Sequence, residues 1–388
     1  MASVNVVAVE QGEQDGNGVE EIVDVVSEDM IVEDAEVETD EISLKVKWGN
    51  VLIPIEINEG STISELKMRL WSLTEVLPAR QKLIGLSKKS ASSLNDDTLL
   101  KSLGMKQEQK IMLVGSLESD IQSVMNISAS ELASDVFDDL DVDYSDSKAL
   151  QETLHKANLK KLERRIEQID IRIMNPFRNG KRLLVLDLDY TLFDCKSAAS
   201  SVSELARPGL HEFLSSVYPF YDIAIWSQTS WRWLEAKITS LGMIFHPNYK
   251  LAFTLDATSM FSVSVQKNNE RTTHSVKALE IIWRKFPDRF DSRNTIHIDD
   301  LGRNFALNPQ SGLKISAFKN APITRASDRE LYLLKDYLVM IASRESDFSR
   351  LRHKDWKFYV STYISDFRAS SLQQHSTSTS DPQLEPPQ

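Results

Sequence analysis

The sequence predicts an α/β protein in which a doubly wound parallel sheet follows a small domain of ββαββ order. Three short apolar runs, at residues 182–186, 223–226 and 295–298, carry the prediction of the sheet, and polar side chains follow each run at once. Strands that are buried on both faces of a parallel sheet have continuous apolar runs of this kind. A helical segment over residues 276–286 precedes the third run, as the alternation of strands and helices in such a sheet requires.

The small domain is expected over residues 42–117. Apolar residues alternate along 42–46 and again along 51–57, on either side of a Gly49-Asn50 turn, which is typical of a β-hairpin. Thr62-Ile63-Ser64-Glu65 then has the pattern of a capping box and predicts the start of a helix with one apolar face. Two further short apolar segments complete the ββαββ order.

Composition excludes several classes of function. The formal net charge is −12, and the acidic excess lies almost entirely before the first lysine, Lys45. Because a nucleic-acid footprint makes a domain basic, we expect no nucleic-acid partner. Cys195 is the single cysteine, which excludes an internal disulfide and a thiolate metal cluster. No apolar run has the length needed to cross a bilayer, so we expect a soluble intracellular protein without membrane association.

The same patterns divide the chain into five regions. Residues 1–41 are expected to form an acidic disordered arm, and residues 369–388, rich in Ser, Thr, Gln and Pro, a disordered tail. Between them we expect the small domain over 42–117, a linker with a helix over 118–172, and the larger α/β domain over 173–368.

Two carboxylates follow the first apolar run of the larger domain. Asp187 and Asp189 come directly after it, and Thr191 lies two residues further on. The carboxyl ends of parallel strands border the crevice in which α/β sheets bind ligands. Burying two acids there costs free energy unless a positive charge compensates them, and a metal cation supplies such a charge. The segment therefore predicts a metal-assisted catalytic site.

Three further elements follow in order and extend this site. Ser227 ends the second apolar run, Lys277 stands at the start of the helical segment, and the pair Asp299-Asp300 ends the third run. Residues 187–191 match the DxDxT signature of haloacid-dehalogenase (HAD) phosphatases, and the four elements together resemble that superfamily. With Arg207-Pro208-Gly209-Leu210, the chain more closely resembles the ubiquitin-like domain-containing CTD phosphatases, a branch of the FCP/SCP-type enzymes.

The resemblance extends to the small domain, which is similar to ubiquitin. Its last strand ends in Met112-Leu113-Val114-Gly115-Ser116, without the paired glycines that conjugation of ubiquitin requires. The domain is therefore expected to be a fixed docking module. The implied fold is a HAD-like, Rossmann-like doubly wound sheet with an N-terminal β-grasp ubiquitin-like domain.

The resemblance also implies a role for each site residue. Asp187 would attack phosphorus and form an aspartyl-phosphate, and Asp189 would act as general acid and then as general base. Ser227 and Thr191 would bind the phosphoryl group. Lys277 would offset the negative charge on the phosphoryl oxygens and on Asp187.

Magnesium is the expected cofactor, because the family uses it and carboxylate oxygens suit it. Its expected ligands are the Asp187 carboxylate, the Asp189 main-chain carbonyl and one acid of the third strand. The family pattern favours Asp300 as this ligand, and Asp299 would then orient waters or Lys277.

Three further residues are weaker candidates. Arg303 either contacts the substrate phosphate or pairs with a neighbouring acid, and both interpretations remain open. His211 and His297 are expected to be packing histidines, because the mechanism leaves no role for them.

The substrate is expected to be a phosphoprotein. Residues 262–273 have the composition of an inserted hairpin, and no cap domain of the size that encloses metabolites is evident. By resemblance, the substrates are phosphoserine or phosphothreonine on subunits of the 26S proteasome, on which the ubiquitin-like domain docks through an apolar patch of its sheet. The tail repeat of RNA polymerase II is the second candidate. A monomer in the nucleus, with the cytoplasm as second compartment, completes the expectation.

Two other classes of function compete with this interpretation. The chain could be a non-catalytic ubiquitin-like adaptor whose second domain only binds phosphopeptides. It could instead be a small-molecule phosphatase, which would prefer a metabolite to phosphopeptides in kcat/KM.

Overall fold

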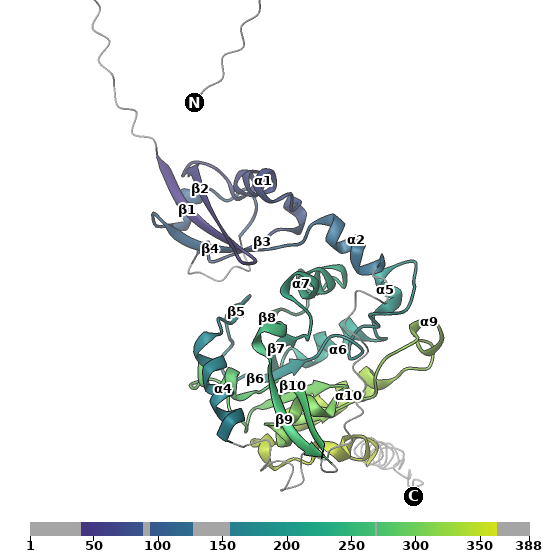
Figure 1. The fold of residues 1–388 in the computed structure, drawn as a ribbon. Helices are drawn as coiled ribbons and strands as arrows, with labels where there is room; N and C mark the ends of the chain where they lie inside the picture. Colours follow the sequence, from purple (N-terminus) through teal and green to yellow (C-terminus); the bar gives the residue numbers. More distant parts are fainter. Residues whose placement is uncertain (1–39, 88–93, 127–155, 268–269, 363–388) are drawn as a thin grey trace, which may run out of the picture. The chain divides into compact units, whose positions relative to one another are not determined.

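A computed structural model describes residues 40–87, 94–126, 156–267 and 270–362. Nearly all of the predicted acidic arm, most of the predicted linker and the predicted C-terminal tail lie outside these residues. Within them, the strands form a four-stranded sheet, a two-stranded hairpin and a six-stranded sheet (Figure 1). None of the helices described there combines the length and the apolar character that crossing a bilayer requires.

The four-stranded sheet belongs to the ubiquitin-like domain and has the strand order β2-β1-β4-β3. Its strands are β1 (Glu41–Trp48), β2 (Val51–Asn58), β3 (Lys82–Ile84) and β4 (Gln109–Val114). β1 is antiparallel to β2 and parallel to β4. Helix α1 (Ile63–Thr74) contributes Leu66 and Leu70 to a core that also contains Leu44 and Val46. The β-grasp order predicted from the alternation is confirmed.

The start of α1 follows from its capping box. The Thr62 hydroxyl accepts a hydrogen bond from the Glu65 main-chain N–H, and the Glu65 carboxylate accepts one from the Thr62 N–H at 2.6 Å. Two of the N–H groups that every helix start leaves unpaired are satisfied in this way. Short 3₁₀ turns at η1 (Pro78–Arg80) and η3 (Leu100–Leu103) connect the remaining strands.

The six-stranded sheet has the order β12-β11-β6-β7-β8-β5. Its strands are β5 (Arg172–Ile173), β6 (Arg182–Leu186), β7 (Tyr221–Trp226), β8 (Leu251–Leu255), β11 (Thr295–Asp299) and β12 (Gly312–Lys314). All pairings are parallel except that of β5 with β8. From β6 the chain adds β7 and β8 on one side, and then β11 and β12 on the other. The topological switch point therefore lies between β6 and β11.

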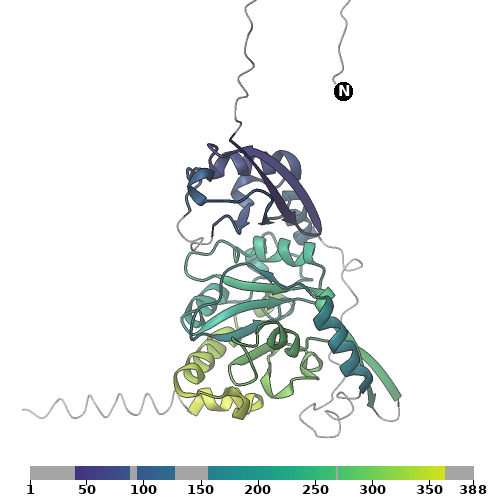
Figure 2. The ribbon, with the colours of Figure 1, turned by 90° about the vertical axis from the view of Figure 1, so that its left-hand side faces the viewer.

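Helices cover both faces of this sheet, as a doubly wound fold requires. Leu184 and Leu186 of β6 pack into one core with α6 and α10, whereas Leu183 and Val185 pack into another with α4 and α8. Figure 2 shows the sheet between these layers. The helices are α2 (Glu118–Asn126), α4 (Lys156–Gln168), α5 (Val202–Leu205), α6 (Leu210–Val217), α7 (Trp231–Ser240), α8 (Glu280–Lys285), α9 (Ala321–Thr324) and α10 (Glu330–Arg344).

The predicted insertion is a hairpin of β9 (Phe261–Lys267) and β10 (Glu270–Val276). The helix expected from Val276 begins later, at Glu280, because Val276 still pairs with Phe261 at the end of the hairpin. Lys277 consequently lies in the turn between β10 and α8. Five further 3₁₀ turns are η4 (Ala257–Ser259), η5 (Gly302–Phe305), η6 (Pro309–Ser311), η7 (Phe348–Arg350) and η8 (His353–Asp355).

Candidate active site

The predicted acids meet at the switch point of the large sheet. The Asp187 main-chain N–H donates to the Ile298 carbonyl at 2.9 Å, so the end of β6 stays paired with β11. Asp187 and Asp299 therefore lie side by side although more than a hundred residues separate them in the sequence. This is the edge of the sheet at which ligands of α/β folds bind.

A buried cluster of three carboxylates forms there. One oxygen each from Asp187, Asp299 and Asp300 lies within 4.8 Å of the other two. Lys277 Nζ donates to Asp187 Oδ1 at 2.5 Å and to Asp299 Oδ2 at 2.7 Å, and its side chain is fully buried. A single ammonium thus faces three acids, and further positive charge is needed before all three can ionise.

This shortage of positive charge raises the pKa values of two of the acids. Burial, with the Asp299 and Asp189 charges, raises the pKa of Asp187 to about 7 against the opposing effect of Lys277. Burial and the charges of Asp299 and Asp187 raise the pKa of Asp300 to about 9. Asp187 Oδ2 is moreover a buried atom without a hydrogen-bond partner. Hard oxygen ligands, excess negative charge and an unpartnered oxygen fit a divalent cation.

The third-strand acids differ in their surroundings. Asp299 accepts hydrogen bonds from Lys277, from Asn304 Nδ2 at 2.8 Å and from the Leu301 N–H at 2.9 Å. Burial alone would raise the pKa of Asp299, but the Lys277 ammonium holds it well below the usual range. Asp299 is thus an ionised acid that protein donors hold in place, whereas the raised pKa of Asp300 indicates a lack of compensating charge.

Asp189 lies beside the cluster in a more open position. About 19% of its side chain is exposed, compared with 4% for Asp187. Its carboxylate accepts a hydrogen bond from Ser227 Oγ at 3.1 Å and another from Lys237 Nζ at 2.5 Å. An acid that is oriented by two donors and remains accessible suits proton exchange with a substrate or a water.

Ser227 is held at the end of β7 by the loop that follows it. Its N–H donates to the Leu255 carbonyl at 3.0 Å, and its Oγ accepts from the Thr229 N–H at 3.1 Å. The Thr229 hydroxyl lies 2.8 Å from the same Oγ. These contacts keep the Ser227 hydroxyl directed toward Asp189.

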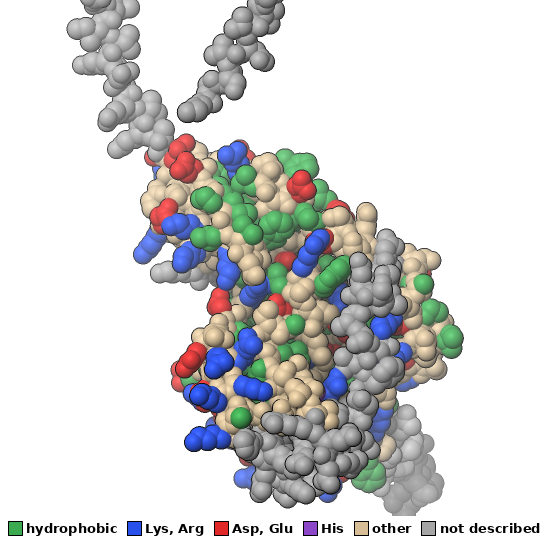
Figure 3. All heavy atoms as spheres, viewed as in Figure 1, with side chains coloured by type: hydrophobic (Ala, Val, Ile, Leu, Met, Phe, Trp, Pro, Cys, Tyr) green, Lys and Arg blue, Asp and Glu red, His purple; other side chains and the backbone are tan. Residues whose placement is uncertain are grey.

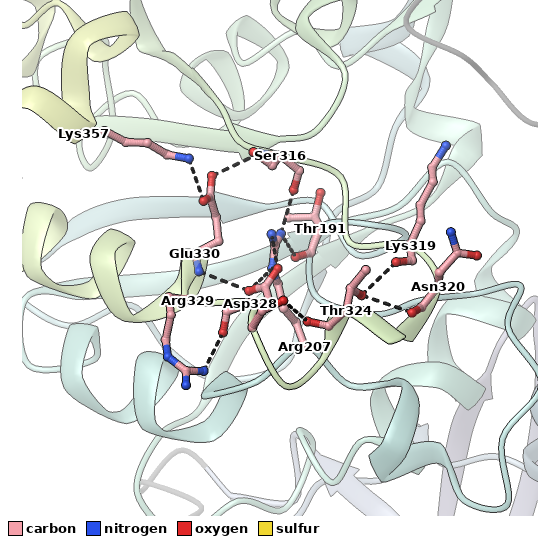
Figure 4. A network of polar contacts seen from close by, with 11 residues as sticks. Thr191, Arg207, Ser316, Lys319, Asn320, Thr324, Asp328, Arg329, Glu330 and Lys357 are labelled. Carbon is pink, nitrogen blue, oxygen red and sulfur yellow. Dashed lines mark hydrogen bonds and ion pairs between the residues drawn. The ribbon is translucent and has the colours of Figure 1, made fainter. Parts of the chain in front are cut away.

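A buried arginine fixes the turn after β6. Tyr190 has a φ of +59°, a left-handed conformation that non-glycine residues adopt only where the surroundings stabilise it. Arg207 donates to the Thr191 carbonyl at 3.1 Å and to the Ser316 carbonyl at 2.9 Å, and it pairs with Asp328 (Figure 4). The Thr191 hydroxyl is buried without a hydrogen-bond partner.

Comparison with known proteins then connects this geometry to a family. The model of the NLI interacting factor-like phosphatase family matches residues 182–349, and that of the ubiquitin family matches residues 42–118. Relatives named "Ubiquitin-like domain-containing CTD phosphatase 1" from Danio rerio and Gallus gallus are each 43% identical over 321 residues, or 82% of this chain and 98% of theirs. The Homo sapiens relative of that name is 43% identical over 317 residues, or 81% of this chain and 96% of its own.

The chain belongs to the ubiquitin-like domain-containing CTD phosphatases. It is accordingly a protein phosphatase, and its larger domain has the HAD-like fold predicted from the sequence. The adaptor interpretation, in which the second domain only binds phosphopeptides, is disfavoured by this membership.

Lys237 is the member of this phosphatase site that the sequence analysis missed. It lies on α7, three residues after Leu234 and four before Leu241, both of which are buried. That spacing puts the lysine on the apolar face of the helix, where a charged side chain is rare unless it is paired. A lysine at this position indicates a buried ion pair, but no local pattern in the sequence identifies Asp189 as its partner.

The weaker candidates differ in how near they lie to the phosphatase site. Arg303 is half-buried on η5, next to the acid pair. His297 is buried and stacks on Trp226, and its Nε2 is 3.6 Å from Asp299, too far for a hydrogen bond. His211 lies away from the cluster, stacked on His246.

Proposed function

We propose that this protein is a magnesium-dependent serine/threonine phosphatase that acts through an aspartyl-phosphate on Asp187. The observation that carries the proposal is the contrast between its two neighbouring acids. Asp187 is buried and bound to Lys277, as suits a nucleophile directed at phosphorus. Asp189 is more exposed and is oriented by two donors, as suits a group that exchanges protons.

The reaction proceeds in two displacements. A carboxylate oxygen of Asp187 bonds to phosphorus while the bond from phosphorus to the seryl or threonyl oxygen breaks, and Asp189 gives that oxygen a proton. Asp189 then takes a proton from a water, which attacks the same phosphorus and releases phosphate and free Asp187. Lys277 stays within hydrogen-bond distance of Asp187 and offsets the negative charge that develops.

Two hydroxyl groups support the binding of a phosphoryl group. Ser227 Oγ lies 3.1 Å from Asp189, close to where the phosphoryl oxygens would lie. Thr191 Oγ1 is buried without a hydrogen-bond partner, so a substrate oxygen would satisfy it. Thr229 contacts the Ser227 hydroxyl, and Arg207 donates a hydrogen bond to the Thr191 carbonyl, so both residues are held in place.

Magnesium would be held by Asp187, Asp300 and the Asp189 main-chain carbonyl, and Asp299 would keep its contacts with Lys277 and Asn304. The raised pKa of Asp300, caused by burial and by the neighbouring carboxylates, supports this division between the two acids. When bound, the ion would neutralise charge on the phosphoryl oxygens and on the acids.

Hydrolysis of an aryl phosphate tests the enzyme proposal directly. The full chain should release phosphate with added Mg²⁺ and lose this activity in EDTA, and Asp187→Asn should reduce turnover by at least 10³-fold, because no covalent intermediate can form. Full turnover by Asp187→Asn would contradict the mechanism. Binding of phosphopeptides without any turnover would favour the adaptor.

The surroundings of the site favour a protein substrate over a metabolite. Between β7 and β11, the described chain contains α7, β8, the β9–β10 hairpin and α8, and no separate cap domain among these residues. A phosphorylated side chain on a protein reaches a site without a cap domain more easily than it reaches a site that a cap domain encloses. A phosphopeptide should therefore exceed a phosphorylated metabolite in kcat/KM, and a marked preference for the metabolite would contradict this part of the proposal.

The ubiquitin-like domain supports nuclear 26S proteasome subunits as the substrates. The pairing register aligns Leu52, Lys47, Met112 and Ile84 in one row across the outer face of its sheet. Leu52 is about half exposed, whereas Met112 and Ile84 are partly buried against the large apolar core, so Leu52 is the accessible apolar residue of the row for docking. The name of the relatives, CTD phosphatase, favours the polymerase II tail as second candidate. Capture of proteasome subunits by the Asp187→Asn full chain would support the first choice, and capture of the polymerase alone would support the second.

A further inference from the structure

A cavity of about 390 Å³ lies between α4 and the β9–β10 hairpin, outside the carboxylate cluster. Figures 1 and 2 both show α4 alongside this hairpin. Lys161, Arg164 and Arg165 line the cavity from α4, and none of its lining residues is acidic. Lys161 Nζ donates to the Ser262 carbonyl at 2.7 Å and so joins the helix to the hairpin. The volume is within the range of natural ligand pockets.

The cavity adjoins the catalytic residues through two of its walls. Gln228 directly follows Ser227, and Ser275, on the strand β10, lies two residues before Lys277. Neighbouring residues are about 3.8 Å apart, and alternate residues of a strand are roughly 7 Å apart. A peptide whose phosphoserine is at Asp187 would therefore bring to the cavity a side chain about two to four residues away, since extended chain spans about 3.4 Å per residue.

Among the residues that the structure describes, no acidic side chain neutralises the positive charge of the cavity. In the described part of the chain, neither Arg164 nor Arg165 forms an ion pair, and Arg165 Nε is buried without a hydrogen-bond partner. Glu163, on the same helix, pairs instead with Arg284 of α8. Figure 3 shows Lys and Arg side chains gathered on the side where Figure 1 places α4.

These observations indicate a ligand of negative charge. Buried polar atoms are nearly always hydrogen-bonded, so the unpartnered Nε calls for an acceptor. Guanidinium groups bind phosphate and carboxylate through paired hydrogen bonds, and they keep their charge at every accessible pH.

We propose that this cavity is a second recognition site for the substrate and binds an anionic side chain, a second phosphoserine or a glutamate, that flanks the phosphoserine to be hydrolysed. The proposal rests on the proposed phosphatase function and adds a class of substrate to it. Arg164 and Arg165 would form the ion pairs, and Lys161 would add long-range attraction. The enzyme would then select serines in acidic or multiply phosphorylated segments.

Three peptides that differ only at the flanking positions test the proposal on the full chain. The first has a single phosphoserine with neutral flanks. The second has glutamates two to four residues from the phosphoserine, and the third has a second phosphoserine at that distance. Dissociation constants are measured with Asp187→Asn, and kcat/KM values with the active enzyme. We expect both anionic peptides to bind at least fivefold more tightly than the neutral one at low salt, and this preference to fall at high salt.

The charge-removed variant Arg164→Gln/Arg165→Gln should reduce the preference to below twofold. Arg164→Gln alone should halve the preference for anionic peptides. Because Arg164 is exposed, this single variant should fold normally even if the double variant does not. Lys160→Gln, on the same helix but outside the cavity, is the matched control and should keep the full preference. If only the doubly phosphorylated peptide is preferred, the ligand is a phosphate and not a carboxylate.

Two results would overturn the proposal. The first is an equal affinity of the three peptides, or a preference that survives in the double variant. The second is tighter binding of the neutral peptide by the double variant, because this would mean that an acidic segment of the chain itself competes for the cavity. Failure of the phosphatase function is distinguishable, since turnover would be absent while the binding preference of Asp187→Asn persists.

Discussion

At the scale of the residue, Lys237 is a buried lysine whose ammonium lies 2.5 Å from the Asp189 carboxylate. We expect Lys237→Met to lower kcat about 10- to 100-fold, part of the roughly 10²–10⁴-fold that general acid–base catalysis provides, because Asp189 loses one of the donors that orient it. The measurement is the pH profile of kcat and kcat/KM, with Lys160→Met as an exposed control. A variant with a lower melting temperature but an unchanged kcat and pH profile would leave Lys237 a purely structural role.

The two acids at the end of β11 should respond differently to removal of their charge. Asp300→Asn should raise the Mg²⁺ concentration for half-maximal activity at least tenfold without loss of stability, because burial and neighbouring charges already raise the pKa of Asp300 to about 9. Asp299→Asn should destabilise the fold by about 3 kcal/mol, since it leaves the buried Lys277 short of a partner. Mg²⁺ titration and thermal unfolding of both variants test this, and the reverse pattern would assign the metal to Asp299.

At the scale of the element, Arg207 joins the turn after β6 to the segments around Ser316 and Asp328. Arg207→Met should lower the free energy of unfolding by about 3–5 kcal/mol, because Asp328 loses its ion pair and the carbonyls of Thr191 and Ser316 lose a donor. It should also lower kcat, since the Thr191 turn loses its support. Chemical unfolding and kinetics measure both effects, with the exposed Arg350→Met as control. A stable variant with normal kcat would contradict this role.

Helix α10 and the turn η8 provide a pH-dependent contact. Tyr337 on α10 and His353 Nδ1 are hydrogen-bonded at 2.9 Å, and burial lowers the pKa of His353 to about 4. Protonation therefore favours the unfolded state, in which the histidine has its ordinary pKa near 6.5. The contribution of His353 to stability is complete above pH 6.5 and is lost as the pH falls toward 4, by at most about 1.4 kcal/mol per pH unit.

His353→Gln should accordingly flatten the fall in unfolding free energy between pH 6.5 and 4.5. Urea titrations of the wild type and of His353→Gln at several pH values measure the two slopes. Carboxylates titrate in both proteins, so the difference between the slopes is due to His353. Burial also lowers the pKa of His246, but less than that of His353, so the control His246→Gln should change the slope less. Identical slopes for the wild type and His353→Gln would show that His353 does not carry this effect.

At the scale of the whole molecule, recognition is divided between docking by one domain and catalysis by the other. Leu52→Asp places a charge in the apolar row of the ubiquitin-like sheet and should reduce capture of proteasome subunits at least fivefold, while turnover of a phosphopeptide is retained. Leu99→Asp, equally exposed but away from the sheet, is the matched control. Equal capture by both variants would place docking elsewhere.

Much of this architecture was predictable because the signals are local. The continuous apolar runs of β6, β7 and β11 reflect burial on two faces, and the Thr62–Glu65 capping box reflects unpaired N–H groups at a helix start. Carboxylates at strand ends predicted the cluster at the switch point, since parallel strands bring their carboxyl ends to one edge. Each of these inferences needed only neighbours within a few residues.

Other features were decided by tertiary packing alone. Lys237 and Asp189 are 48 residues apart, and the cavity brings α4 against the ends of β7 and β10. The difference between Asp299 and Asp300 arises from Lys277 and Asn304, which only folding brings to one of the two acids. The sequence by itself determined the fold class and the chemistry of the site. The pairing of its charges and the cavity beside it required the structure, because contact energies depend on distance and burial, which no local pattern contains.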